Sequence, residues 1–248
     1  MILLALSFFF IALAYSVVGF GGGSSYLALL ALFNTPYELI PKISLLCNIV
    51  VVLGGSIHFM RNKHLSWALT KPIIIISIPM ACIGGFIPIS AKVFYGLLGV
   101  LLLIVGLRPL LIQNRRNQIV HSKKYQIIKY MALGGLIGLI SGMVGIGGGI
   151  FLAPLLLNIT DEAPKTIAAT TSLFILFNSI SGFVGQVFKS GVSSTVLFDF
   201  WPLFLACIIG GQIGSLLGSG KVISQKTVGY MTAVMVIYVG TKTLWRAF

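Results

Sequence analysis

Two glycine clusters interrupt long apolar segments of this chain, and they constrain its fold more than any other feature. The first is Gly19-Phe20-Gly21-Gly22-Gly23, and the second is Gly145-Ile146-Gly147-Gly148-Gly149. A glycine inside a helix costs about 1 kcal/mol relative to alanine. Lipid offers no substitute for lost backbone partners, so a broken helix at membrane depth must lie inside protein or beside a water-filled cavity. Each cluster therefore predicts a helix break, and matching breaks in two halves are typical of transporters built from repeats.

Composition indicates that the rest of the chain lies in a bilayer. Hydrophobic residues make up 57% of the sequence and charged residues only 8%, whereas soluble domains carry about 25% charged residues. The net charge of +13 comes from Lys and Arg residues at the ends of apolar segments and in one loop. This distribution favours contact with anionic lipid headgroups over nucleic acid. We expect an all-α polytopic membrane protein.

The apolar segments are the expected membrane helices. They cover residues 2–33, 38–60, 66–89, 92–112, 126–157, 164–188, 196–218 and 226–246. A spanning helix needs about 20 residues, so most segments fit one crossing. The first and fifth segments are too long for one straight helix, and both contain a glycine cluster. Each is predicted to form a helix, a glycine break and a second short helix, within a total of about eight transmembrane helices.

The two halves of the chain resemble each other. The glycine clusters align at an offset of 126 residues, and Ile43-Ser44-Leu45 matches Thr171-Ser172-Leu173 at an offset of 128. The strongest polar stretch lies between the halves. We therefore expect two homologous four-helix repeats, residues 1–112 and 126–248, joined by a basic cytoplasmic linker at 113–125.

The distribution of positive residues bears on membrane orientation. One crossing per segment places twelve Lys and Arg residues on the side of the linker and five on the other side, which favours the linker side as cytoplasmic. Both termini would then be cytoplasmic. If the short helices after the glycines also cross, the tally is the same, but the termini lie outside and the repeats are inverted. These helices, about 24–33 and 150–158, are short for a crossing at 1.5 Å per residue. Eight crossings are therefore favoured, and the repeat orientation stays open.

The glycine breaks suit an anion. A break exposes the first N–H groups of the next helix, and the helix dipole adds about half a positive charge there. Hydroxyl and amide side chains that follow in sequence would complete the set of hydrogen-bond donors around the anion. The alternative is that the glycines only pack helices and the hydroxyls bond their own backbone. The predicted substrate-binding residues are Gly21, Gly22, Gly23, Ser24, Ser25, Asn48, Gly147, Gly148, Gly149, Thr170, Thr171, Ser172 and Asn178.

The second cluster and its surroundings resemble a known family. The stretch Gly142-Met143-Val144-Gly145-Ile146-Gly147-Gly148-Gly149-Ile150-Phe151-Leu152-Ala153-Pro154-Leu155-Leu156 is followed by Ala168-Ala169-Thr170-Thr171-Ser172-Leu173 and Asn178. With a glycine cluster opening each half, the chain is similar to the sulfite exporter TauE/SafE family over nearly its whole length. The first copy departs from the pattern, since it has Ser24-Ser25-Tyr26 and lacks the proline matching Pro154. The resemblance implies a carrier of sulfur-containing anions such as sulfite or organosulfonates.

Enzyme signatures are missing from the sequence. No Gly-Lys-Ser/Thr follows either cluster, so neither is a P-loop, and no HExxH or GxSxG motif occurs. Only four acidic residues and three histidines are present, and Cys47, Cys82 and Cys207 lack metal-ligand spacing. We expect no catalytic activity, no cofactor and no bound metal.

The sequence therefore predicts a secondary transporter in the plasma (inner) membrane. It would move a small sulfur-containing anion, sulfite or an organosulfonate, in the export direction by alternating access at the paired broken helices. The alternatives are uptake of a sulfur compound such as thiosulfate, a channel, or a non-transporting membrane scaffold subunit. The identity of the anion, the coupling ion and the oligomeric state are left open.

Overall fold

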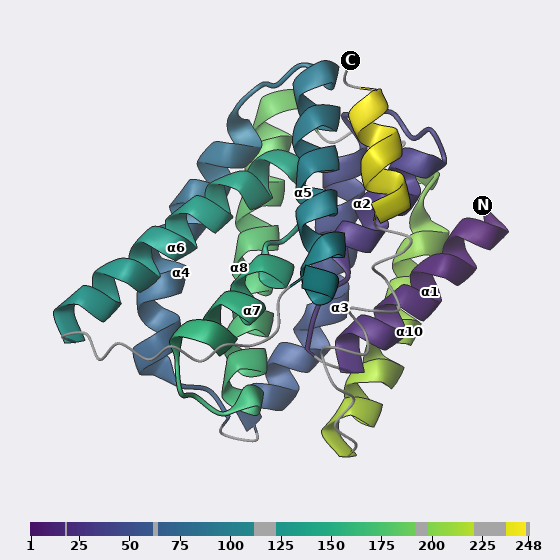
Figure 1. Cartoon of the computed structure of the whole chain (residues 1–248). Helices are drawn as coiled ribbons and strands as arrows, with labels where there is room; N and C mark the ends of the chain where they lie inside the picture. Colours follow the sequence, from purple (N-terminus) through teal and green to yellow (C-terminus); the bar gives the residue numbers. More distant parts are fainter. Residues whose placement is uncertain (18, 62–63, 112–122, 192–197, 221–236, 247–248) are drawn as a thin grey trace.

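The computed structural model describes residues 1–17, 19–61, 64–111, 123–191, 198–220 and 237–246, and every extended regular element in these ranges is an α-helix. This confirms the all-α prediction. A further helix covers residues 237–245. The other helices (Figure 1) are α1 Ile2–Val17, α2 Gly23–Leu32, α3 Ile40–Arg61, α4 Trp67–Phe86, α5 Ala91–Leu111, α6 Lys123–Val144, α7 Gly149–Ile159, α8 Pro164–Ser190 and α10 Trp201–Gly220.

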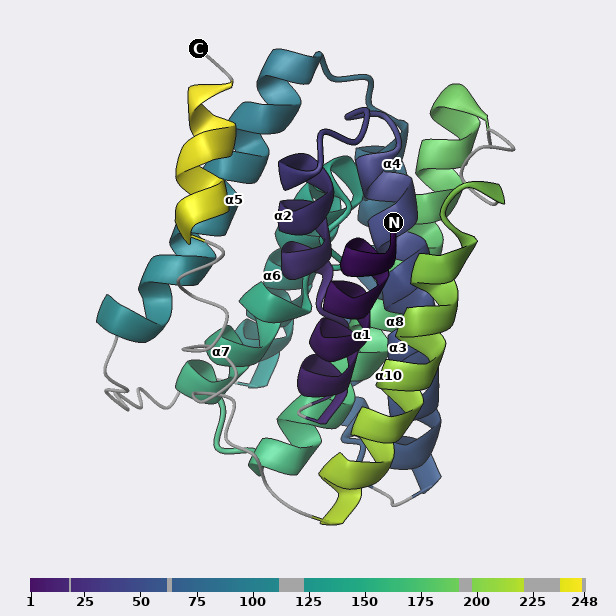
Figure 2. The ribbon, with the colours of Figure 1, turned by 90° about the vertical axis from the view of Figure 1, so that its right-hand side faces the viewer.

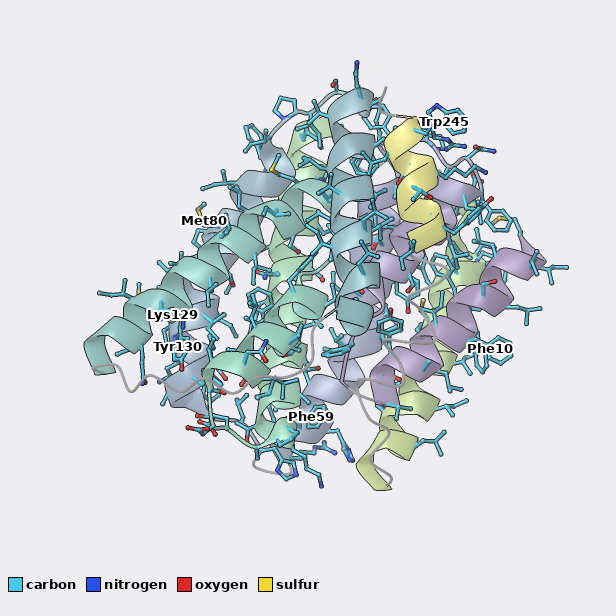
Figure 3. The ribbon with its side chains drawn as sticks, viewed as in Figure 1. Phe10, Phe59, Met80, Lys129, Tyr130 and Trp245 are labelled. Carbon is cyan, nitrogen blue, oxygen red and sulfur yellow. The ribbon has the colours of Figure 1, made fainter. Side chains whose placement is uncertain are left out.

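The outer surface of the helix bundle is apolar. Phe10 on α1 and Trp245 near the C-terminus are 63% and 85% exposed and point away from the bundle (Figure 3). Extensive exposed apolar surface marks contact with a membrane or a partner. Among the described residues, four helices are long and apolar enough to cross a bilayer, namely Ile40–Arg61, Trp67–Phe86, Gln126–Val144 and Pro164–Ser190. The total of eight crossings stays a prediction, because part of the last apolar segment lies outside the described residues.

Both predicted helix breaks are present. The long apolar segment at 2–33 divides into α1 and α2, and the segment at 126–157 divides into α6 and α7. After its break each short helix reverses direction, so that α2 leads back toward the end of the molecule from which α1 comes (Figure 2). Helix α2 is buried along almost all of its length, from Gly23 to Ala31.

Contacts between α3 and α8 show that these two helices are antiparallel. Ser56, late in α3, forms a 3.0 Å hydrogen bond with Ser172, early in α8. At the other end, the Lys42 ammonium donates to the carbonyl of Gly191, just after α8, across 2.7 Å. Since α3 and α8 are the helices matched by sequence, the corresponding helices of the two halves run in opposite directions.

Two other pairs of helices, each with one member from either half, are parallel. Glycines of α6 pack against α4 in increasing order, with Gly134 at Ile73 and Gly138 at Ser77, so α4 and α6 are parallel. Helix α10 packs in the same way against α1, and it also contacts α3. Helix α4 therefore packs on α6 and α8 from the other half, while α10 packs on α1 and α3. The two halves of the chain are interlocked rather than side by side.

The antiparallel directions of α3 and α8 differ from the parallel repeats that the sequence favoured, while the number of crossings stays a prediction. Helix α2 turns back at its glycine break instead of completing the crossing begun by α1. Every later helix therefore starts from the opposite side of the membrane to that expected with parallel repeats. Lys189 consequently lies near Lys42, not on the opposite side as the eight-crossing tally required. The Arg246 guanidinium donates to the carbonyl of Ala31 across 3.0 Å, so the C-terminal end lies beside the end of α2.

Candidate anion site at the meeting of two broken helices

Left-handed glycines form both helix breaks. Gly22 and Gly148 are the residues that precede α2 and α7, with φ of 85° and 78°. Gly19, Gly145 and Gly147 are also left-handed, with φ between 80° and 88°. A side chain at such a φ meets the following carbonyl, which costs about 1–2 kcal/mol per residue. The backbone conformation of the breaks therefore explains why these clusters consist of glycine.

The first turns of α2 and α7 have no side-chain cap. Neither Gly22 nor Gly148 offers a side chain, and no side-chain hydrogen bond caps either helix. Ser, Thr, Asp or Asn normally occupies this position and satisfies one of the free N–H groups. An uncapped N-terminus keeps those N–H groups and the positive end of the dipole available to an anion.

The two breaks touch each other. A side chain on Gly23 would collide with the carbonyl oxygen of Ile146, so the absence of a Cβ lets the two clusters meet. The hydroxyl of Ser44 on α3 lies 2.9 Å from the carbonyl oxygen of Gly145 and 3.3 Å from that of Gly23. One hydroxyl thus contacts both breaks. The sequence prediction did not include Ser44, although it aligns with Ser172 in the repeat.

Asn48, one turn further along α3, is the second link between the breaks. Its Nδ2 donates to the carbonyl of Ile146 across 3.1 Å. Its Oδ1 has no hydrogen-bond partner among the described residues and would lie 2.5 Å from a Cβ on Gly21. Asn48 is fully buried, and a buried polar atom without a partner is costly. A polar ligand that donates a hydrogen bond to Oδ1 would remove this cost.

A small pocket lies at this junction, with a cavity volume of about 10 Å³. The first break and Asn48 form its polar wall, and Ile146, Ile150 and Ile175 form an apolar wall from the second half. Ser24 contributes a buried hydroxyl, for which the described part of the chain provides no hydrogen-bond partner. The described residues that line it are Tyr15, Phe20, Gly21, Gly22, Gly23, Ser24, Asn48, Ile146, Gly149, Ile150 and Ile175.

Six predicted site residues come together in this pocket: Gly21, Gly22, Gly23, Ser24, Asn48 and Gly149. Gly147 and Gly148 belong to the second break behind it. A Cβ on Gly147 would lie 2.6 Å from Asn48 Nδ2, and one on Gly148 would lie 2.8 Å from a methyl of Ile137. The sequence prediction missed Tyr15, Phe20 and the isoleucines of the apolar wall, because such side chains are indistinguishable from ordinary core residues in an apolar sequence.

Other predicted residues form contacts elsewhere. Ser25 hydrogen-bonds the hydroxyl of Tyr15 at 3.0 Å, immediately beside the pocket. Thr170 pairs with Thr70 on α4 at 2.9 Å, and Ser172 pairs with Ser56 on α3. The structure does not bring these last two predicted residues into the pocket, and both hydroxyls connect helices.

Thr171 and Asn178 on α8 are buried but do not line the pocket. Their side-chain polar atoms have no hydrogen-bond partner within the described ranges, and a methyl of Thr171 lies 3.1 Å from a Cβ position on Gly149. Ser141 and Ser179 near the second break also carry unpaired buried hydroxyls. The second break thus has its own set of unsatisfied polar groups, and the predicted substrate role of Thr171 and Asn178 stays a prediction.

The helical bundle, its apolar outer surface and the two glycine breaks define a multi-pass membrane protein of the kind built around broken helices. Comparison with known proteins assigns it more closely. The family model described as sulfite exporter TauE/SafE matches residues 4–243. The chain belongs to the sulfite exporter TauE/SafE family, which confirms the resemblance drawn from the glycine motifs.

Several curated proteins are similar to this chain. A probable membrane transporter protein of Sinorhizobium fredii is 31% identical over 245 residues, covering 98% of this chain and 97% of that protein. A probable membrane transporter protein of Bacillus subtilis is 22% identical over 260 residues, covering 93% and 92%. The sulfite exporter TauE/SafE family protein 5 of Arabidopsis thaliana is 33% identical over 132 residues, or 49% of this chain and 28% of that protein. No solved structure matches the chain.

Proposed function

We propose that this chain is a secondary transporter of a small sulfur-containing anion, sulfite or an organosulfonate, and that it exports this anion across the plasma membrane. One observation carries the proposal: two uncapped helix N-termini from opposite halves meet on Asn48 beside a buried pocket. Free N–H groups and helix dipoles bind anions. The name of the matched family supports sulfur chemistry.

The antiparallel directions of corresponding helices support an alternating-access mechanism. Inverted repeats place a substrate site between two halves that can rock about it. Here the α1–α2 hairpin and the α6–α7 hairpin enter from opposite ends of the bundle and touch at Gly23 and Ile146. Separation of the hairpins on one side, with contact kept on the other, would open the pocket to one face of the membrane at a time.

An anion leaving a cell needs no separate energy source beyond the membrane potential. Movement of one charge across 100 mV is worth about 2.3 kcal/mol, and an inside-negative potential drives anions outward. Neutral donors fit this role, because a carrier must release its substrate as well as bind it. We expect no catalytic chemistry from these groups.

The test is flux into proteoliposomes that contain the purified protein, with labelled sulfite, thiosulfate and methanesulfonate offered separately at both membrane polarities. The informative variant is Gly21→Ala. Gly21 is not left-handed, and its new methyl would sit 2.5 Å from Asn48 Oδ1, so it fills the pocket without straining the backbone. Saturable flux in the wild type and its loss in folded Gly21→Ala support the proposal.

A matched control is Gly55→Ala on the same helix as Asn48. Among the described residues, a Cβ there has one neighbour within 4 Å, Ser172 Oγ at 3.5 Å, so the folded structure accommodates it. This variant should transport like the wild type. Absence of flux for all anions in the wild type would favour the scaffold alternative, and net flux only toward the inside would replace export by uptake.

A further inference from the structure

The polar wall of the pocket contains donors and the side-chain amide oxygen of Asn48, which can only accept a hydrogen bond. The first-turn N–H groups of Gly23 and Ser24 are donors, and the Ser24 hydroxyl, 2% exposed, has no partner. The acceptor is Oδ1 of Asn48, which is 0% exposed and also has no partner. An anion site made only to hold a bare oxyanion would present donors alone.

The orientation of the Asn48 amide is determined by its neighbours. Nδ2 donates to the carbonyl oxygen of Ile146. Rotation of the amide by half a turn would place Oδ1 against that oxygen, so two acceptors would face each other and the bond would be lost. Oδ1 must therefore point toward Gly21, where the absence of a side chain leaves the pocket open.

A fully deprotonated oxyanion has no hydrogen-bond donor for the amide oxygen of Asn48. Sulfate and the sulfite dianion present only lone pairs to Oδ1, and a simple sulfonate offers an alkyl group, so the buried acceptor stays unpaired with each of them. An anion that keeps one O–H or N–H on or beside its central atom satisfies the donors and the acceptor together. A site built to hydrogen-bond such a group discriminates strongly against an analogue that lacks it.

Given the anion transport proposed above, we infer that the pocket selects a small monoanion that retains its own hydrogen-bond donor, of the hydrogensulfite type, and that Asn48 Oδ1 determines this specificity. The isoleucine side chains of the opposite wall, at Ile146, Ile150 and Ile175, offer no hydrogen-bonding group to the acceptor. The uncapped N-terminus of α2 binds the negative oxygens of the anion, and Asn48 Oδ1 accepts a hydrogen bond from the anion's own donor.

Sulfamate and methanesulfonate form a matched pair of probes. Both are monoanions of similar size with the same sulfonate oxygens, and they differ only in an amino group against a methyl group. Saturable flux of each labelled anion is measured in proteoliposomes with the wild-type protein, with unlabelled sulfate as a competitor. We expect a KM for sulfamate about tenfold or more below that for methanesulfonate, and little competition by sulfate.

Two variants assign the effect to one atom. Asn48→Ala removes the acceptor and should bring the two KM values together. Ser24→Ala removes a donor and should raise both KM values while leaving their ratio unchanged. If Asn48→Ala does not fold, the wild-type ratio alone decides the matter.

Equal KM values in the wild type would overturn the inference and leave the transport function standing. Persistence of the sulfamate preference in folded Asn48→Ala would also overturn it, because the acceptor would then lie elsewhere. Absence of saturable flux for sulfamate, methanesulfonate and sulfite alike would overturn the transport function itself, and the inference with it.

Discussion

The side-chain amide of Asn48 donates to the main-chain carbonyl of Ile146 across 3.1 Å and joins α3 of the first half to the glycine break of the second half. Ser44, one turn earlier on α3, makes a second such link to Gly145. These bonds fix the distance between the two hairpins at the point where their helix N-termini meet. Any motion that opens the pocket must stretch or exchange them.

Replacement of Asn48 by leucine should lower stability. The variant leaves the buried carbonyl of Ile146 without this donor, which costs about 1–3 kcal/mol, and a fall in the melting temperature of the detergent-solubilised protein would show it. Asn178→Leu is the control, because both side-chain polar atoms of Asn178 are already unpaired in the structure. Equal melting temperatures for the two variants would contradict the role given to the Asn48–Ile146 bond.

Alanine at left-handed glycines should separate backbone strain from function. Gly148→Ala and Gly191→Ala both place a Cβ at positive φ, so each should lose stability, by about 1–3 kcal/mol. Among the described residues, the Cβ of residue 148 meets Ile137 at 2.8 Å and Phe174 at 2.9 Å, while that of residue 191 has no neighbour within 4 Å. We expect Gly148→Ala to abolish flux and Gly191→Ala to keep it per folded molecule. Similar flux in both would show that the second break is not part of the transport path.

The hydroxyl pairs between helices should affect stability rather than transport. Thr70 bonds Thr170 and Ser56 bonds Ser172, and such bonds between membrane helices are worth about 0.6 kcal/mol on average. A double-mutant cycle on Ser56 and Ser172 should give a coupling energy of this size, with the KM for the transported anion unchanged. A severalfold rise in KM in Ser172→Ala alone would restore this residue to the substrate site.

The direction of the helices gives a topological prediction. Lys189 lies near Lys42 at one end of α3, whereas Lys71 follows Thr70, which bonds the start of α8 at the other end. Single cysteines at positions 189 and 71, in a background without Cys47, Cys82 and Cys207, should therefore react with a membrane-impermeant maleimide from opposite sides. The eight-crossing arrangement with parallel repeats places them on the same side, so same-side labelling would contradict the helix directions.

The sequence was sufficient to predict the all-α class and both helix breaks, because a cluster of glycines in an apolar segment strongly disfavours a continuous helix. It was not sufficient to predict the path of the chain after a break. The ten residues of α2 can complete a crossing or turn back, and the choice depends on the conformation of Gly22 and on packing against α3. That single choice decides whether the repeats are parallel or inverted.

In the candidate site, too, some residues could be predicted from the sequence and others became visible only in the packed structure. Glycines and Asn48 stood out in the sequence because each is costly in an apolar helix unless it has a structural reason. Ser44 did not stand out, because serine is common in membrane helices and bonds its own backbone without penalty. Conversely, Thr170 and Ser172 looked like ligands, and only the positions of α3 and α4 show that each already has a partner.

The position of a bound anion in a crystal would locate the substrate site directly. Selenite is a chemical analogue of sulfite, and its selenium gives an anomalous signal in diffraction from crystals soaked or grown with it. We expect one strong peak in the pocket, within hydrogen-bonding reach of the Gly23 and Ser24 amides and of Asn48, and its loss in Gly21→Ala. A peak at another place in the bundle, with this pocket empty, would contradict the assignment of the paired helix breaks as the substrate site.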